Sequence, residues 1–270
     1  MNITDEELLM IEHLTYLNES VAKAAGLKGI ELVENRSIYT LLSSFDSTAI
    51  ANLEAKGDEP LAAEVSGYEW AQIIKYLQNN TRLNKLVLIE TMETPKGVPL
   101  ALCFTDGTPD TREAIIAFKG TTGGDEWSDN VEGAILRDTP DQIEALEFVQ
   151  GLPYADITLT GHSKGGNKAN YITILCDKVT RCVGFDPQGF SQLFLNDPKY
   201  SKRIEERASL IKNYSLSTDF VHILLYELPG AKQIFCKGFG VDSTGQHHSP
   251  NSFFYTDYYG NLVLDGIFEF

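Results

Sequence analysis

The stretch LTGHSKGG, residues 159–166, places Gly161 and Gly165 two positions before and two positions after Ser163. β-Forming residues lead into it in ADITLTGH (155–162), and a helix pattern, GGNKANYITILCDKV, begins at Gly165. A strand-to-helix turn this sharp holds its central residue in a strained backbone conformation. Side chains two positions away would collide with the adjoining strand or helix, so both positions need glycine. The pattern predicts a nucleophile elbow with Ser163 at its tip.

Short β-rich runs alternate with helix patterns through the rest of the chain. The predicted strands cover residues 85–92, 99–106, 113–120, 155–162, 180–186, 210–216, 232–238 and 253–265. Between them, Thr139, Pro140 and Gln142 form the start of a helix: an N-cap, a first-turn proline and the closing residue of a capping box. This alternation implies right-handed crossovers and a mainly parallel sheet with helices on both faces. We therefore expect an α/β-hydrolase fold.

The first 80 residues are predicted to be helical and to pack against this sheet. Thr4 and Glu7 have the spacing of a capping box that begins the first helix. One face of this helix is predicted to carry Met10, Leu14, Leu17 and Val21. No internal repeat or linker is visible, so we expect a single domain over residues 1–270, with the helical N-terminal segment 1–80 packed on the sheet.

Composition excludes several classes of function. The net charge of −16 and the pI near 4.7 disfavour binding to nucleic acid or to anionic lipid headgroups. The acidic N-terminus has no secretory signal pattern, and no apolar stretch is long enough for stable membrane insertion, so we expect a cytoplasmic protein. The cysteines lack metal-type spacing and are predicted to be reduced core thiols: Cys103, Cys176, Cys182 and Cys236. No metal or organic cofactor is expected.

A serine hydroxyl becomes a good nucleophile only when a base removes its proton. In this fold the chain order is Ser, then Asp or Glu, then His, and the histidines after Ser163 are His222, His247 and His248. The last two lie in the turn-rich stretch GQHHSPNSFFY, where the base is expected, and the residues alone leave the choice between them open. His162, beside the serine, is expected to point away from the site and to pack.

The acid that orients the histidine is predicted to be Asp219, which stands just past a predicted strand. Asp186, at the end of RCVGFD, is the first alternative because a neighbouring strand end can also supply the acid, and Asp242 is the second. Two backbone N–H groups should stabilise the negative charge that develops on the substrate. Lys164, after the nucleophile, is expected to supply one, and the loop that begins at Gly120 the other.

Two segments resemble a known family. AFKGTTGGDEWSDN (117–130) resembles the F-R-G-T/S…W…D segment of class 3, fungal-type triacylglycerol lipases, and LTGHSKGGNKA resembles their G-H-S-x-G-G-x-x-A elbow. The resemblance implies a Ser163–Asp219–His248 triad with an oxyanion hole made by Thr121 and Lys164. A closer likeness, over nearly the full length, is to uncharacterised bacterial cytoplasmic lipase-like proteins. These proteins have an ending similar to HSPNSFFYTD (248–257), in which the histidine directly before the first serine is the base. This likeness favours His248 over His247.

Lys119 departs from the lipase pattern, which has arginine there, so the support of the adjoining loop is expected to differ. The one lid candidate, GFSQLFLNDPKY (189–200), is interpreted as a packing insertion. The sequence therefore predicts a serine esterase that acts on small-molecule or lipid acyl esters. The alternatives are a catalytically weak binding module of the same fold and a thioesterase or acyltransferase that uses the same site.

Overall fold

The computed structural model describes residues 1–120, 136–238, 247–256, 262–264 and 267–268. The strands of the main sheet are β1 (Arg36–Ser37), β2 (Val87–Glu93), β3 (Pro99–Thr105), β4 (Glu113–Phe118), β5 (Asp156–His162), β6 (Val179–Phe185), β7 (Ile211–Leu216), β8 (Lys232–Cys236) and β11 (Ile267–Phe268). A separate antiparallel pair is formed by β9 (Phe254–Thr256) and β10 (Leu262–Leu264). Seven predicted strands lie close to β2–β8, whereas the predicted strand 253–265 corresponds to the separate pair β9 and β10, and β1 lies in the segment predicted to be helical.

The main sheet has the order β1-β2-β3-β4-β5-β6-β7-β8-β11. From β4 to β8 every neighbouring pair is parallel, as predicted. The edge formed by β1, β2 and β3 is antiparallel, because β2 and β3 are joined by a short turn rather than by a crossover helix. β5 is the middle strand of the nine-stranded sheet, and the elbow that follows it lies at the carboxyl edge of the parallel strands. These features define the α/β-hydrolase fold.

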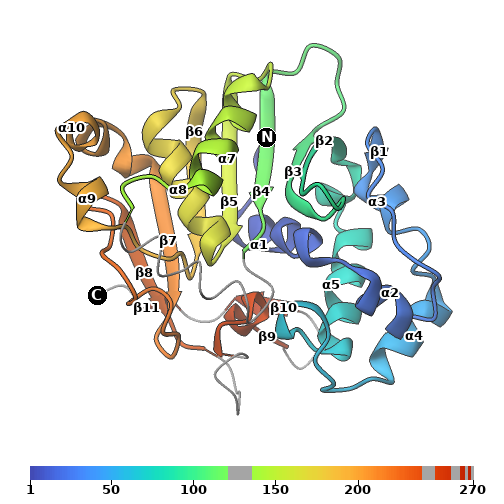
Figure 1. Ribbon diagram of the computed structural model, residues 1–270. Coiled ribbons are helices and arrows are strands. Elements are labelled where there is room, and N and C mark those ends of the chain that lie inside the picture. Colours follow the sequence, from blue (N-terminus) through green and yellow to red (C-terminus); the bar gives the residue numbers. More distant parts are fainter. Residues whose placement is uncertain (121–135, 239–246, 257–261, 265–266, 269–270) are drawn as a thin grey trace.

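Helices cover both faces of the sheet (Figure 1). The helices before β2 are α1 (Asp5–His13), α2 (Glu19–Ala24), α3 (Ile38–Leu41), α4 (Ser47–Glu54) and α5 (Gly67–Asn79). The helices after β4 are α7 (Pro140–Gly151), α8 (Lys164–Leu175), α9 (Gln192–Leu195) and α10 (Pro198–Arg207). Short 3-10 helices occur at Leu14–Tyr16, Ala62–Glu64, Leu83–Lys85, Ala208–Leu210 and Pro250–Phe253.

Alternate residues of the strands pack into two hydrophobic cores, one on each face of the sheet. In β4, Ile115 and Ala117 pack with the N-terminal helices, whereas Ile116 and Phe118 pack with the helices that follow β4. This period of two is the normal consequence of strand geometry. The long apolar runs of the parallel strands are thus explained, because the sheet is buried on both sides.

The predicted first helix is shorter than expected. Its capping box forms, with Thr4 Oγ1 accepting from Glu7 N–H and the Glu7 carboxylate accepting from Thr4 N–H. The helix ends at His13, continues as a 3-10 turn over Leu14–Tyr16, and a new helix starts after Asn18, whose side chain caps it. Competition from this asparagine cap, which favours a helix start over a helix interior, breaks the predicted long helix.

The segment 189–200 packs as interpreted. Phe194, in α9, is fully buried, and its ring lies 4.7 Å from that of Phe190 and 4.9 Å from that of Tyr200. Figure 1 shows α9 and α10 beside β6 and β7, on the opposite side of the molecule from α2–α5. Within the described part of the chain, none of the helices combines the length and the apolar character needed to cross a bilayer.

Candidate active site

Ser163 lies at the turn between β5 and α8 with φ +59° and ψ −127°, a conformation that side-chain-bearing residues rarely adopt. A Cβ on Gly161 would lie 2.4 Å from the Gly165 carbonyl carbon, and one on Gly165 would lie 2.0 Å from the Phe118 carbonyl oxygen. The steric reason predicted for both glycines is therefore confirmed. The chain turns at Ser163 in the strained geometry of a nucleophile elbow.

Asp219 and His248 are brought together from elements far apart in the sequence. Asp219 follows β7, and its Oδ1 lies 3.0 Å from Nδ1 of His248, in the segment that leads to Pro250–Phe253. The second carboxylate oxygen of Asp219 accepts a hydrogen bond of 3.0 Å from the Val221 N–H. Both carboxylate oxygens of Asp219 are therefore hydrogen-bonded. These two bonds fix the orientation of the carboxylate and of the His248 ring.

The electrostatics of Asp219 favour its charged form. Burial alone would raise the pKa of this carboxyl, but interactions with His222 and His248 and the charge of His248 hold the pKa well below its ordinary value of 3.8. His222 Nδ1 lies 3.8 Å from Asp219 Oδ2, which is beyond hydrogen-bond length, so His248 is the hydrogen-bonded imidazole of the two.

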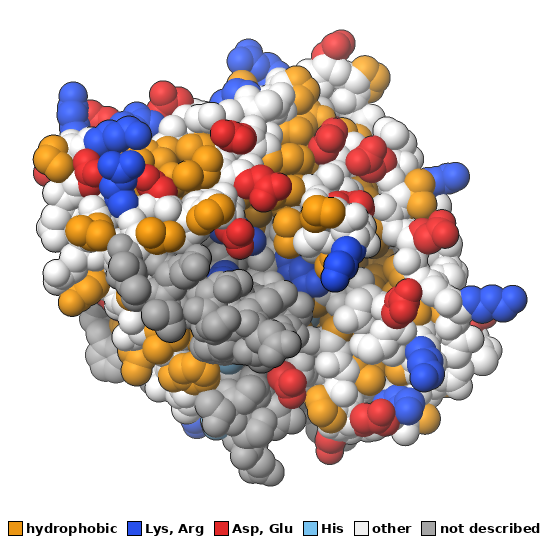
Figure 2. Space-filling model, in the orientation of Figure 1, with side chains coloured by type: hydrophobic (Ala, Val, Ile, Leu, Met, Phe, Trp, Pro, Cys, Tyr) orange, Lys and Arg blue, Asp and Glu red, His pale blue; other side chains and the backbone are white. Residues whose placement is uncertain are grey.

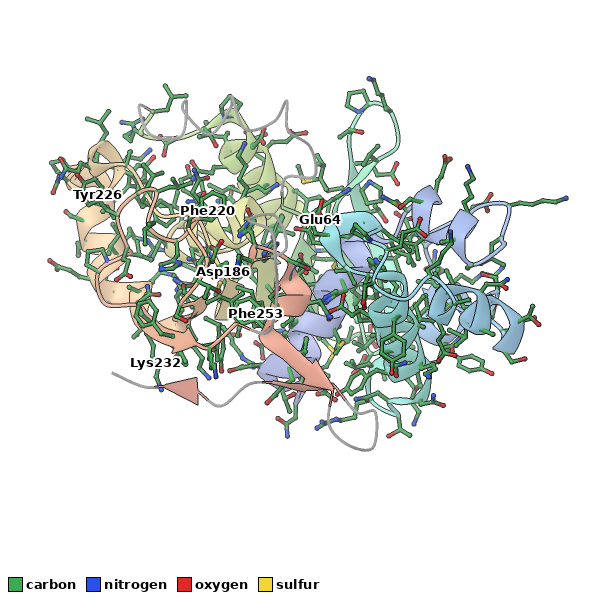
Figure 3. The ribbon with its side chains drawn as sticks, turned by 90° about the horizontal axis from the view of Figure 1, so that it is seen from below. Glu64, Asp186, Phe220, Tyr226, Lys232 and Phe253 are labelled. Atoms are coloured by element: carbon green, nitrogen blue, oxygen red, sulfur yellow. The ribbon has the colours of Figure 1, made fainter. Side chains whose placement is uncertain are left out.

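Asp186, the first alternative acid, lies at the end of β6 and is fully buried, with φ +41°. Its Oδ1 accepts a hydrogen bond of 2.7 Å from the Leu216 N–H. Burial, followed by repulsion from Asp219, raises the pKa of Asp186 well above 3.8, whereas the pKa of Asp219 is lowered. Figure 3 shows Asp186 near the middle of the molecule with Phe253, whose ring lies 5.5 Å from that of Phe185. Asp242 lies outside the described residues.

His162 lies against His248 and does not point away from the site as expected. Its ring does pack, but against His248, with ring centroids 4.5 Å apart and an interplanar angle of 35°. Burial, and then the nearby charge of His248, lower the pKa of His162 well below 6.5, so His162 is neutral at pH 7. Because His162 directly precedes Ser163, this stacking places His248 at the elbow. His247 is half-buried beside it, and its Nδ1 has no hydrogen-bond partner among the described residues.

The described residues show no hydrogen bond between Ser163 Oγ and His248. Catalytic hydrogen bonds are often long in enzymes without substrate and tighten when substrate binds. The expected proximity of His248 Nε2 and Ser163 Oγ is therefore still a prediction.

Gly120, where the predicted oxyanion loop begins, lies beside the elbow. A Cβ on Gly120 would lie 3.0 Å from the Ser163 Cβ and 2.6 Å from the His162 carbonyl oxygen, so only glycine fits there. Lys164 is the first residue of α8, and the N–H groups of a first helical turn point out of the helix end. Thr121, the other predicted donor, lies outside the described residues.

Two hollows adjoin the elbow. One of about 300 Å³ is bordered by Gly120, Lys164 and Leu100, and another of about 120 Å³ by Lys164, Asn167 and Phe190. Their linings mix apolar and polar side chains. On the face shown in Figure 2, acidic and basic side chains are likewise interspersed with hydrophobic ones. Lys164, next to the predicted nucleophile, lines both hollows.

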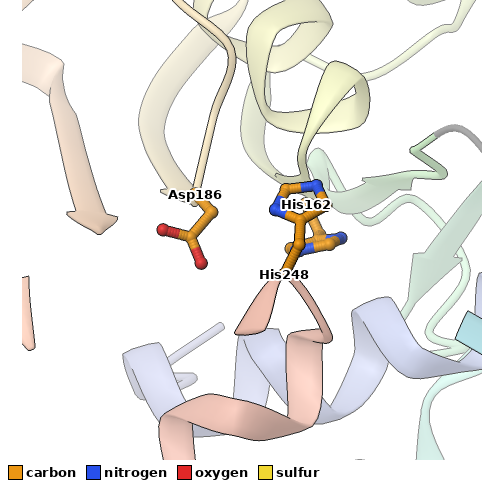
Figure 4. Close-up of side chains that lie close together, drawn as sticks. All are labelled: His162, Asp186 and His248. Carbon is orange, nitrogen blue, oxygen red and sulfur yellow. The ribbon is translucent and has the colours of Figure 1, made fainter. Parts of the chain in front are cut away.

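His162, Asp186 and His248 each offer an atom of the kind that binds metals, all within 4.8 Å of one another (Figure 4). The two imidazole rings face each other at a tilt of 35°, however, and a metal is bound in the plane of each ring. Lone pairs of rings stacked 4.5 Å apart do not converge on one point at the bond length of about 2.0 Å that zinc requires. The arrangement therefore favours ring packing over metal binding.

The fold and the strained serine at the carboxyl edge of the sheet define the chain as an α/β-hydrolase-fold protein with a nucleophile elbow. The family model described as Mbeg1-like matches residues 83–228, more than half of the chain, and the chain belongs to the Mbeg1-like family. This match covers the sheet from β2 to β7, the elbow and Asp219, and ends before His248.

Known structures are only distantly similar. Lip2 lipase from Yarrowia lipolytica is 13% identical, with a TM-score of 0.39, and the match covers 69% of this chain and 76% of the lipase. The Rhizomucor miehei lipase propeptide complex is 12% identical, with a TM-score of 0.37 and coverages of 62% and 66%. M37 lipase is 12% identical, with a TM-score of 0.39 and coverages of 83% and 70%. No curated protein sequence matches the chain. The strand order and the elbow, rather than these likenesses, define the fold.

Proposed function

We propose that the protein is a serine hydrolase of carboxylic esters, with Ser163 as nucleophile, His248 as base and Asp219 as the acid that orients the base. The observation that carries this proposal is the hydrogen-bonded Asp219–His248 pair, stacked on the residue that precedes a serine in elbow geometry. The charge of Asp219 also supports it, because an ionised carboxylate accepts a hydrogen bond from Nδ1–H and stabilises the imidazolium formed in the reaction.

The proposed reaction proceeds through an acyl-enzyme. His248 takes the proton of Ser163 Oγ as the oxygen attacks the carbonyl carbon of the ester, and the N–H groups of Lys164 and Thr121 stabilise the resulting oxyanion. Protonated His248 then donates its proton to the alcohol oxygen as the carbon–oxygen bond breaks. Water, deprotonated by His248, attacks the acyl-serine and releases the carboxylic acid. All of these steps use side chains and amides of the chain, so the proposal includes no cofactor.

The proposed substrates are small-molecule or lipid acyl esters without a nucleic acid component, bound in the hollows beside Lys164. Their mixed polar and apolar linings fit an ester with one apolar and one polar part. The buried cysteines fit the cytoplasmic location predicted from the sequence, which is part of the same proposal.

Hydrolysis of p-nitrophenyl esters of increasing chain length tests the proposal, with the same acyl groups offered as thioesters. The chain should release p-nitrophenol, and Ser163→Ala should lower kcat by about 10⁴-fold or more, because the nucleophile is lost. Faster turnover of the thioesters would assign the site to a thioesterase. Equal background rates for the wild type and Ser163→Ala would contradict the proposal and indicate a binding module.

A further inference from the structure

The ring of His162 lies between the N-terminal helical segment and the proposed base. His162 is the last residue of β5, and its side chain is buried. Its Nδ1 lies 3.1 Å from the Tyr16 hydroxyl oxygen, at hydrogen-bond distance. Its face meets the ring of His248, with centroids 4.5 Å apart, and Figure 4 shows the two rings one over the other. One ring thus connects the 3-10 turn after α1 to His248.

The Tyr16 end of this connection is itself held in place. Tyr16 is buried, and its hydroxyl oxygen accepts a hydrogen bond of 3.0 Å from the Gly120 N–H. The rings of Tyr16 and His162 also pack edge to face, with centroids 6.2 Å apart and an interplanar angle of 71°. A hydrogen bond at one nitrogen of an imidazole fixes the orientation of its ring. The Tyr16 hydroxyl therefore holds the His162 ring in the plane in which it meets His248.

His248 is held at an edge and at a face. Its Nδ1 is hydrogen-bonded to Asp219, and His162 covers one face of its ring. Phe220 is a second aromatic neighbour, but it lies farther away, with ring centroids 6.1 Å apart. If the ring swings about its edge, its other nitrogen moves away from the reacting atoms, and a displacement of about 1 Å can lower a rate by about 10²-fold. The contact with His162 opposes this swing.

A histidine combines two properties that this position needs. A cation beside His248 would repel the imidazolium that forms when the base takes a proton. Burial, and then the nearby charge of His248, lower the pKa of His162 well below 6.5, so its ring stays neutral. A phenylalanine would also be neutral, but it has no ring nitrogen to bond to the Tyr16 hydroxyl. His162 therefore provides a neutral face and an anchored edge.

We propose that His162 is a positioning residue for the base: anchored by the Tyr16 hydroxyl, its ring supports one face of His248 and keeps that imidazole aligned with Asp219. This inference rests on the proposed ester hydrolysis. Loss of the support should slow the proton transfers that His248 performs and leave substrate binding unchanged. We therefore expect kcat to fall while KM stays the same.

A double-mutant cycle tests this role, because residues that act through one another have non-additive effects. His162→Ala removes the supporting ring, and Tyr16→Phe removes only the oxygen that anchors it. Each substitution is made in the wild type and in His248→Ala. Values of kcat and KM are measured on a p-nitrophenyl ester, at a temperature where thermal melts show the proteins folded.

His13→Ala is the matched control for His162→Ala. His13 is also a buried histidine with a lowered pKa, but its ring lies 6.1 Å from that of Trp70 and belongs to the core around α1. It should keep the wild-type kcat. An equal loss of kcat in His13→Ala and His162→Ala would show that removal of any buried imidazole has this effect, and would overturn the inference.

In the wild type, His162→Ala should lower kcat by about 10²-fold and Tyr16→Phe by about tenfold, with KM unchanged. In His248→Ala, whose residual activity does not use the base, neither change should lower kcat further by more than about twofold. If His162→Ala does not fold, the cycle of Tyr16→Phe with His248→Ala decides.

Equal losses of kcat with and without His248, or a change in KM rather than in kcat, would overturn the role of His162 and leave the proposed ester hydrolysis standing. A folded wild type that does not turn over the ester would overturn the proposed hydrolysis, and this inference with it.

Discussion

The elbow and the acid–base pair are held in place by different means. At the elbow, six residues from Gly161 to Gly166 determine the conformation. A Cβ added to Gly161, Gly165 or Gly166 would lie 2.4, 2.0 or 2.9 Å from a backbone atom, so no larger residue fits. Asp219 and His248 are 29 residues apart and are joined by one side-chain hydrogen bond. The first arrangement is enforced by close backbone contacts, among them that of Gly165 with Phe118 of β4, and the second depends on one pair of side chains. Changes at the elbow should therefore affect the fold, and changes at the pair should affect the chemistry.

The largest effect is expected for Gly165→Ala. The new methyl group would meet the Phe118 carbonyl oxygen at 2.0 Å, and neither backbone can move without disrupting the central sheet. We expect the free energy of unfolding to fall by about 3 kcal/mol or more and activity to be lost with it. Urea denaturation monitored by circular dichroism measures the change.

Gly151→Ala is the matched control for this substitution. Gly151 ends α7, and a Cβ there would have nothing within 4 Å. It should change stability by less than about 1 kcal/mol in either direction. Similar stabilities for the two alanine variants would show that the close packing of the elbow does not exist.

The next effect separates the two carboxylates of the site. Asp219→Asn should lower kcat by about 10⁴-fold, since an amide no longer holds the productive tautomer of His248. Asp186→Asn should change kcat by less than about threefold, because the Asp186 carboxyl accepts from the Leu216 N–H rather than from His248, and an amide oxygen can accept the same hydrogen bond. Both rates are measured on the same ester, with thermal melts to verify folding. If the order of the two effects is reversed, Asp186 is the acid.

The last effect concerns the acid stability of α1, which packs against β4, β5 and β6. Burial lowers the pKa of His13 from 6.5 to about 4, although a hydrogen bond to the Leu9 carbonyl opposes the shift. The folded state thus resists protonation, and the stability it gains from neutral His13 is present above pH 6.5 and is lost as the pH falls toward about 4. The loss should be about 3 kcal/mol.

Urea unfolding at about pH 7 and about pH 4.5 measures this loss, with His13→Phe as the variant that cannot titrate. The variant should have a weaker dependence of stability on pH than the wild type, whatever its absolute stability. An identical dependence in both proteins would assign the acid sensitivity to other groups.

Features determined by neighbouring residues could be read from the sequence. The capping boxes of α1 and α7, the alternation of strands and helices, and Gly161 each depend on contacts within a few positions, whereas Gly165 is also required by its contact with Phe118 of β4. The length of the first helix could not be predicted, because the hydrophobic spacing of its residues continues through Asn18, where the chain starts a new helix.

Features determined by tertiary contact were only partly accessible. Asp219 was favoured by its place after a strand, whereas the choice of His248 over His247 depended on family resemblance. Nothing in the sequence indicated that His162 stacks on His248 or that Tyr16 reaches Gly120, since these contacts connect segments about 90 to more than 100 residues apart. Buried polar residues near the start of the chain, such as Glu12 and Tyr16, were the one available signal, and a helical pattern alone does not show that they are buried.

The central claim is that Ser163 is the activated nucleophile of the protein. Reaction with a fluorophosphonate probe, followed by proteolysis and mass spectrometry of the adduct, tests it most directly. We predict one stoichiometric adduct on the peptide that contains Ser163, none in Ser163→Ala, and much slower labelling in Asp219→Asn. An adduct on another residue, or no adduct on the folded wild-type protein, would contradict the account.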